Sequence, residues 1–163
     1  MEKELAIHEI PPVYDKNARI LILGSFPSVK SRETQFFYGH PQNRFWKVLS
    51  QVFSCELPVT VEEKKHMLLS HHIAVWDVIA RCEIAGSSDS SIEQVLPNDI
   101  SLIVNEAPIK AIYTNGKKAH ELYCKYCQEI VGMKAVSLPS TSPANASYGI
   151  TRLVEVWKCI KEV

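Results

Sequence analysis

The strongest constraint on the fold is the alternation of short strand patterns with helical patterns. Ala18–Phe26 (ARILILGSF) is a continuous apolar run that stops at Gly24, which is typical of a strand buried on both faces. Three further ranges have strand patterns, namely Ile73–Ile79, Lys110–Thr114 and Lys134–Leu138. The predicted helices are Asn43–Phe53, Val61–Ser70, Ser91–Leu96, Pro97–Glu106, Gly116–Ile130 and Ile150–Ile160. This order predicts an α/β fold, with a mostly parallel sheet covered by helices on both faces.

Composition sets limits on organisation and class. A chain of 163 residues that is 46% hydrophobic predicts one domain over 1–163. The N-terminus lacks the apolar core of a signal peptide, and no apolar run is long enough to span a membrane, so we expect a cytoplasmic protein, nucleoid-associated if bacterial. The net charge is zero, so composition gives no support for DNA binding.

The cysteines and histidines do not indicate a metal site. An odd count of five cysteines argues against a disulfide framework, and the CxxC of Cys124 and Cys127 falls inside a predicted helix with no second CxxC. His71 and His72 are adjacent, and neighbours on a chain rarely share one metal. We therefore expect no metal and no cofactor.

Ligands of such sheets bind beyond the carboxyl ends of the strands, which selects four stretches of this chain. Gly24–Ser28 (GSFPS) follows the first strand, and Phe36, Phe37 and Tyr38 come soon after it. Gly24 permits close backbone approach and Pro27 stiffens the turn. The aromatic rings could stack on a flat base, or could close the core beneath a long loop.

Three polar side chains at this edge have two readings each. Asn43 caps the predicted helix, or it orients a water or contacts a base. Asp77, within the apolar string VWDVI, bonds nearby backbone amides, or it serves a function. Asn115 occupies a turn, or its amide reads a base edge.

The stretch after the last strand is rich in proline and small polar residues. Ser140, Thr141 and Ser142 could bind phosphates, while Pro139 and Pro143 would keep the loop rigid. The stretch could equally be an ordinary connection between a strand and a helix.

Two segments resemble known proteins. Phe37–Leu49 (FYGHPQNRFWKVL) resembles the segment after the first motif of mismatch-specific uracil-DNA glycosylases. Together with Leu23–Ser28 (LGSFPS), it is more similar to the hypoxanthine-DNA (deoxyinosine) glycosylase branch of the uracil-DNA glycosylase superfamily. Thr141–Asn145 (TSPAN), Ile73–Ile92 and Thr114–Ala119 also resemble this branch, so the resemblance covers residues 18 to 160.

The resemblance implies a single-domain three-layer sandwich with a central four-stranded parallel sheet. It implies monofunctional hydrolysis of an N-glycosidic bond in base-excision repair, without a metal. The partner would be DNA containing deaminated bases, bound by a monomer with the damaged nucleotide flipped out.

The resemblance also implies roles for particular residues. The first motif usually carries an Asp or Asn that orients water, and Gly24–Ser28 has neither, so attention moves to Asn43. Phe37 would stack on the base, and Asp77 and Asn115 would read its edge. The remaining predicted site residues are Ser25 (catalytic), Gly24, Phe26 and Pro27 (substrate-binding), and Pro139, Ser140, Thr141, Ser142, Pro143 and Asn145 (DNA-binding).

A carboxyl group at Asp77 favours hypoxanthine over uracil or xanthine as the preferred base. Three alternatives stay open at this point. The first is a uracil or mismatch-specific glycosylase, and the second is a non-catalytic nucleotide- or DNA-binding domain of the same fold. The third is a serine hydrolase in which Ser25 pairs with a histidine such as His40.

Overall fold

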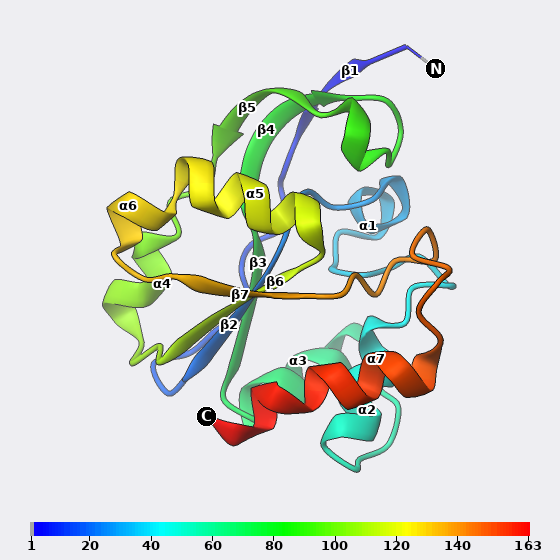
Figure 1. Ribbon diagram of the computed structural model, residues 1–163, viewed down its shortest axis with the longest axis vertical. Helices are drawn as coiled ribbons and strands as arrows, with labels where there is room; N and C mark the ends of the chain where they lie inside the picture. Colours follow the sequence, from blue (N-terminus) through cyan, green and yellow to red (C-terminus); the bar gives the residue numbers. More distant parts are fainter. Residues whose placement is uncertain (1) are drawn as a thin grey trace.

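A four-stranded parallel sheet forms the centre of the protein (Figure 1). The computed structural model describes residues 2–163. The strand order in this sheet is β3-β2-β6-β7. Its strands are β2 (Ile20–Gly24), β3 (Ile73–Asp77), β6 (Ala111–Asn115) and β7 (Ala135–Leu138). The predicted sheet and its parallel direction are confirmed.

Helices cover both faces of this sheet (Figure 1). One face carries α2 (Phe45–Val52), α3 (Val61–Ser70) and α7 (Ile150–Trp157), and the other carries α4 (Ser101–Glu106), α5 (Lys117–Tyr126) and α6 (Gln128–Val131). Side chains of a strand point alternately to opposite faces. Ile20 and Ile22 of β2 accordingly join the core under α2, α3 and α7, whereas Leu21 and Leu23 join the core on the opposite face. The three-layer arrangement is therefore confirmed.

A second, antiparallel sheet was not predicted. It contains β1 (Glu4–Ile7), β4 (Ile79–Ile84) and β5 (Glu93–Pro97), in the order β1-β4-β5. The predicted strand Ile73–Ile79 divides at Val78, where the chain leaves β3 and enters β4. The helix predicted for Ser91–Leu96 is wrong, because a short 3-10 turn, η1 (Asp89–Ser91), leads into β5. No side chain of β5 is fully buried, so no alternating pattern marks this strand in the sequence.

Several helix boundaries also differ from the predictions. The helix predicted from Pro97 begins only at Ser101, and the one predicted over Gly116–Ile130 divides at Cys127 into α5 and α6. The last helix ends at Trp157 and continues as a 3-10 turn, η2 (Lys158–Glu162). Within residues 2–163, no helix is both long and apolar enough to span a bilayer.

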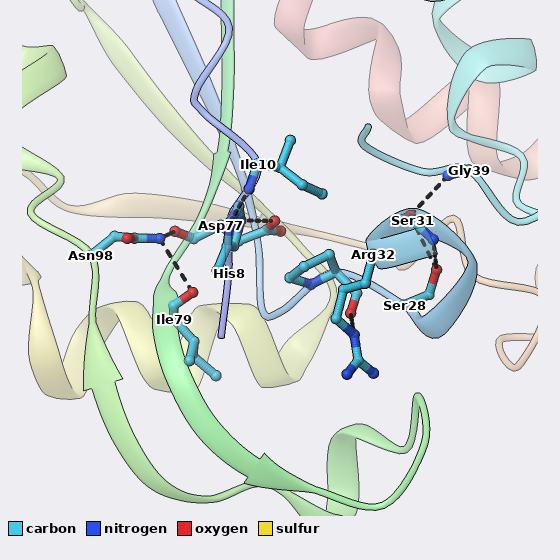
Figure 2. Close-up of polar contacts among 10 residues, drawn as sticks. His8, Ile10, Ser28, Ser31, Arg32, Gly39, Asp77, Ile79 and Asn98 are labelled. Atoms are coloured by element: carbon cyan, nitrogen blue, oxygen red, sulfur yellow. Dashed lines mark hydrogen bonds and ion pairs between the residues drawn. The ribbon is translucent and has the colours of Figure 1, made fainter. Parts of the chain in front are cut away.

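The helix α1 (Val29–Thr34) was not predicted either. It begins directly after the Gly24–Ser28 turn. Its N-terminus is capped by Ser28, whose Oγ accepts a hydrogen bond from the Ser31 backbone N–H at 3.1 Å (Figure 2). The helix α1 therefore fixes the direction in which the chain leaves the Gly24–Ser28 turn.

The register of the parallel sheet brings the predicted stretches to one edge. Gly24 pairs with Asp77 across β2 and β3, and Asn115 pairs with Leu138 across β6 and β7. The last residues of all four strands therefore lie at the same edge, where the polar side chains of the loops can meet.

Candidate functional site

A cleft of about 340 Å³ opens at the carboxyl edge of the parallel sheet. Twelve of the fourteen predicted site residues line it, and only Pro139 and Asn145 do not. Those twelve are Gly24, Ser25, Phe26, Pro27, Phe37, Asn43, Asp77, Asn115, Ser140, Thr141, Ser142 and Pro143. The volume lies within the range of ordinary small-molecule sites, and a single nucleobase is of that scale.

Thr141 connects the two asparagines of the cleft. The Asn115 Oδ1 atom accepts a hydrogen bond from the Thr141 backbone N–H at 3.0 Å, and Asn115 Nδ2 donates to Thr141 Oγ1 at 3.0 Å. The Thr141 hydroxyl then donates to Asn43 Oδ1 at 2.9 Å. Thr141 is fully buried and its side chain positions the two amides, while a contact of this residue with DNA remains a prediction.

This network fixes the orientation of the Asn43 side chain. Its Oδ1 also accepts, at 2.9 Å, from the backbone N–H of Phe45, the first residue of α2, while Arg44 occupies the N-cap position itself. Since both donors bond the oxygen, the remaining polar group of Asn43 is the Nδ2 amide, a donor at the cleft. Asn43 therefore satisfies the first N–H of the helix, as a cap does, and also lines the site, so the two interpretations of this residue are compatible.

Asp77 pairs with a histidine from the N-terminal segment (Figure 2). The His8 Nε2 atom lies 2.8 Å from Asp77 Oδ2, and both side chains are buried. The Ile10 backbone N–H donates to His8 Nδ1 at 3.2 Å. Asn98 Nδ2 donates to the backbone oxygen of Asp77 at 2.9 Å, which fixes the main chain where β3 meets β4. The reading of Asp77 as a group that bonds only backbone amides is thus wrong.

Tyr38 is a further site residue that the sequence reasoning did not single out from its aromatic neighbours. Its ring stacks on Phe45 with centroids 3.9 Å apart, and its hydroxyl is buried without a hydrogen-bond partner among the described residues. Burial raises the pKa of the Tyr38 phenol well above its usual range, and the negative charge of Asp77 raises it further. Tyr38 therefore stays a neutral donor at the cleft.

Ser25 contacts a carboxylate rather than a histidine. Its Oγ donates to Asp89 Oδ1 at 2.8 Å. His40 also lines the cleft, but its Nδ1 accepts from the Gln42 backbone N–H and does not contact Ser25. A nucleophilic serine needs a base within hydrogen-bond distance of its hydroxyl. The arrangement therefore does not support the serine hydrolase that the sequence left open.

The loop after β7 is held by one arginine. The Arg44 guanidinium donates to the backbone oxygens of Ser142 at 2.9 Å, Asn145 at 3.1 Å and Tyr148. The Arg44 backbone N–H donates to Thr141 O at 3.1 Å. Asn145 lies outside the cleft and bonds Ser140 O through its Nδ2, so its side chain supports the loop from within.

The aromatic residues lie between core and cleft. Phe37 lines the cleft but is only 2% exposed, and its ring contacts those of Phe36 and His8 with centroids 5.6 and 6.0 Å away. Phe37 therefore belongs to the core and also lines the cleft. Stacking of Phe37 on a base remains a prediction.

No group of His, Cys, Asp and Glu side chains within residues 2–163 could hold a metal ion. Of the CxxC pair, Cys124 is exposed and Cys127 is buried, and burial raises the pKa of the Cys127 thiol to about 11. The break between α5 and α6 falls at Cys127. Neither thiol lines the cleft.

The fold and the cleft can now be compared with known proteins. A sequence model of the family described as "Uracil DNA glycosylase superfamily" matches residues 11–163. The chain belongs to the uracil DNA glycosylase superfamily. The resemblance of the Phe37–Leu49 and Thr141–Asn145 segments to this superfamily is thereby confirmed.

Curated relatives within the superfamily carry a more specific name. A protein named hypoxanthine DNA glycosylase from Methanosarcina acetivorans is 36% identical over 92% of this chain and 94% of its own length. A protein with the same name from Methanosarcina barkeri is 34% identical over 83% and 85%. A solution NMR structure of a putative uracil DNA glycosylase from M. acetivorans has a TM-score of 0.77 and 32% identity, and the match covers 93% of this chain and 96% of the other.

Replacing Gly24 by alanine should damage the site. A Cβ atom at this position would lie 2.3 Å from Asp77 Oδ1 and 3.2 Å from the Tyr38 hydroxyl. Asp77 cannot move away without breaking its hydrogen bond to His8. We expect Gly24→Ala to lower the free energy of unfolding by about 1–3 kcal/mol, as measured by urea denaturation. An unchanged urea midpoint would contradict the tight contact between Gly24 and Asp77.

Asp89 should make stability depend on pH. Although Asp89 as a residue is exposed, desolvation of its carboxyl group raises the pKa, the Ser25 hydrogen bond opposes the shift, and the charge of Asp77 adds to it. The folded state therefore binds this proton more tightly than the unfolded state, so ionised Asp89 costs stability above its unfolded pKa. Asp89→Asn should raise the melting temperature at neutral pH, and the gain should shrink as the pH falls through the folded pKa of Asp89. A gain of equal size at acidic pH would contradict this cause.

Proposed function

We propose that this protein is a monofunctional DNA glycosylase that removes hypoxanthine from deoxyinosine in DNA. The observation that supports this most directly is the cleft itself, where an Asp77 acceptor and donors from Asn43 and Tyr38 converge at the carboxyl edge of the sheet. The names of the curated relatives agree with this substrate. The superfamily to which the chain belongs favours hydrolysis over binding without chemistry.

The proposed reaction needs no covalent intermediate between the DNA and the protein. As the N-glycosidic bond breaks, its electron pair leaves with the base and the sugar acquires oxocarbenium character. A water molecule then attacks C1′ of the sugar, and the products are free hypoxanthine and an abasic site. Enzymes accelerate such a step by stabilising charge on the departing base and by positioning the water.

We assign the positioning of the attacking water to Asn43. Its Oδ1 is occupied by Phe45 and Thr141, so Nδ2 is the group that can donate to the water oxygen. The second lone pair of that oxygen remains available for attack on the sugar. The cleft lining contains no lysine among the described residues, which agrees with hydrolysis rather than strand cleavage through a covalent amine.

We assign recognition of the base edge to Asp77, Tyr38 and Asn115. Hypoxanthine presents a ring N1–H donor and an O6 acceptor, which match a carboxylate oxygen and a neutral hydroxyl respectively. The hydroxyl groups of Ser140 and Ser142, which line the cleft, would donate to phosphates on the strand that carries the flipped nucleotide. The zero net charge of the chain is compatible with uncharged donors of this kind.

The substrate assignment can be tested with labelled oligonucleotides that contain deoxyinosine, deoxyuridine or deoxyxanthosine. Reactions with the purified protein in EDTA would be followed by alkali, which cleaves at abasic sites. We expect the fastest cleavage at deoxyinosine. Equal rates at deoxyuridine and deoxyinosine would contradict the preference for hypoxanthine, and binding without cleavage at any base would favour a non-catalytic domain.

A further inference from the structure

His8 has a fixed protonation pattern in its buried pair with Asp77. The Ile10 backbone N–H donates to His8 Nδ1, so this nitrogen carries a lone pair and no proton. The ring proton must then sit on Nε2, which lies 2.8 Å from Asp77 Oδ2. The exposed fractions of the two side chains are 1% and 5%, so water does not compete for these atoms. Figure 2 shows the imidazole between the Ile10 backbone and the carboxylate.

This pattern leaves one defined oxygen of Asp77 for a ligand. Oδ2 accepts from His8, whereas Oδ1 has no hydrogen-bond donor within residues 2–163. Oδ1 lies beside Gly24, and both residues line the cleft. Asp77 therefore presents to the cleft one carboxylate oxygen whose partner has still to be supplied.

We infer that His8 is a positioning residue that sets the base specificity of the site, an inference that rests on the proposed glycosylase function. By holding Oδ2, it directs Oδ1 alone at the ring N–H of the flipped base. Hypoxanthine satisfies this acceptor with N1–H. Adenine carries a lone pair at N1, which faces the carboxylate unfavourably, and such a mismatch of buried polar groups gives strong discrimination.

The His8–Asp77 pair also disfavours binding of guanine. Guanine also has an N1–H, but its 2-amino group requires a second acceptor next to the first. A carboxylate normally supplies both oxygens to such a pair of donors. Here the second oxygen already accepts from His8, so the amino group would lack a partner in a buried site. His8 thus lets Asp77 accept a deaminated purine and reject the two normal ones.

No local pattern in the sequence indicates this role of His8. His8 stands 69 positions before Asp77, and the match to the superfamily model starts at residue 11. It reaches Asp77 because β1 pairs with β4, the strand that begins at Ile79, and the His8 backbone N–H donates to Ala80 O at 2.7 Å. The second sheet therefore places His8 beside Asp77.

The first test compares Asp77→Asn with Asp77→Ala. If His8 donates to position 77, an asparagine there must place its oxygen toward His8 and its amide hydrogens toward the base. Those hydrogens would face the N1–H of hypoxanthine, donor against donor. We expect Asp77→Asn to excise hypoxanthine about tenfold more slowly than Asp77→Ala. A faster Asp77→Asn would overturn the inference, because the amide oxygen would then face the base.

The second test adds His8→Phe to Asp77→Asn. The phenyl ring can occupy the space beside Phe26 and Phe37, whose rings lie 6.1 and 6.0 Å from that of His8, but it has no N–H. The asparagine is then free to turn its oxygen to the base. We expect the double variant to recover at least about tenfold over Asp77→Asn alone. No recovery in a protein that melts like Asp77→Asn would overturn the inference.

Two controls separate the possible failures. Glu9→Ala, at an exposed neighbour of His8, should leave the rates and the melting temperature unchanged. If the double variant does not fold, the order of Asp77→Asn and Asp77→Ala decides alone. If the wild-type protein excises no deaminated base, the proposed function fails. In that case nitrogen NMR of His8 still tests the His8–Asp77 pairing by itself. A ring that carries its proton on Nε2 and none on Nδ1 supports the pairing, and a proton on Nδ1 overturns it.

Discussion

Asn43→Ala should reduce hypoxanthine excision by about a hundredfold or more, because it removes the donor that we assign to the attacking water. The same change removes the acceptor for the Phe45 backbone N–H and the Thr141 hydroxyl. The free energy of unfolding should therefore fall by about 1 kcal/mol, the usual cost of losing a helix cap. Single-turnover kinetics and urea denaturation measure the two effects.

Asn43→Asp separates these two roles. A carboxylate keeps the oxygen that caps α2 and accepts from Thr141, but it has no N–H to offer to a water. We expect wild-type stability together with excision at least about tenfold slower than the wild type. A variant that is both stable and fully active would show that the Asn43 amide group is not needed, and would restrict this residue to its structural role.

Arg44→Ala should strongly destabilise the protein, because one guanidinium donates hydrogen bonds to three backbone oxygens of the loop after β7. Hydrogen bonds from a charged donor are each worth about 1.5–3 kcal/mol, and the three are not additive. We expect a loss of about 3 kcal/mol in the free energy of unfolding. Amide hydrogen exchange over residues 140–148 should become faster than in the wild type.

Arg44→Lys is the matched control for charge. A lysine retains the positive charge near the DNA but cannot reach three carbonyl groups in the geometry of a guanidinium fork. It should resemble Arg44→Ala in hydrogen exchange and in the free energy of unfolding. If Arg44→Lys instead behaved as the wild type, the role of Arg44 would be electrostatic attraction of DNA rather than rigidity of the loop.

The central sheet could be predicted because its strands are marked by their own residues. Ile20–Gly24 is buried along its whole length, and a continuous apolar run of that kind is typical of a parallel strand. The rule that ligands bind at the carboxyl edge then selected Asp77 and Asn115, and the family resemblance selected Asn43; all three line the cleft. The first two positions needed only local patterns and one topological rule.

The second sheet and its contribution to the site depend on contacts that local patterns do not record. β1 exposes most of its side chains, and it becomes a strand by pairing with β4, far along the chain. His8 reaches Asp77 through that pairing. The Asn43–Thr141–Asn115 network likewise joins two loops to the end of β6, so the buried position of Thr141 between the two amides is not visible in any one segment.

The most direct test of the glycosylase account is the identity of the first product. Duplex and single-stranded oligonucleotides with one deoxyinosine would be incubated with the protein in EDTA, and the released small molecules separated by chromatography. The account predicts free hypoxanthine, in amounts equal to the abasic sites, with the strand intact until alkali is added. Release of a nucleoside or nucleotide, or strand cleavage without free base, would contradict it.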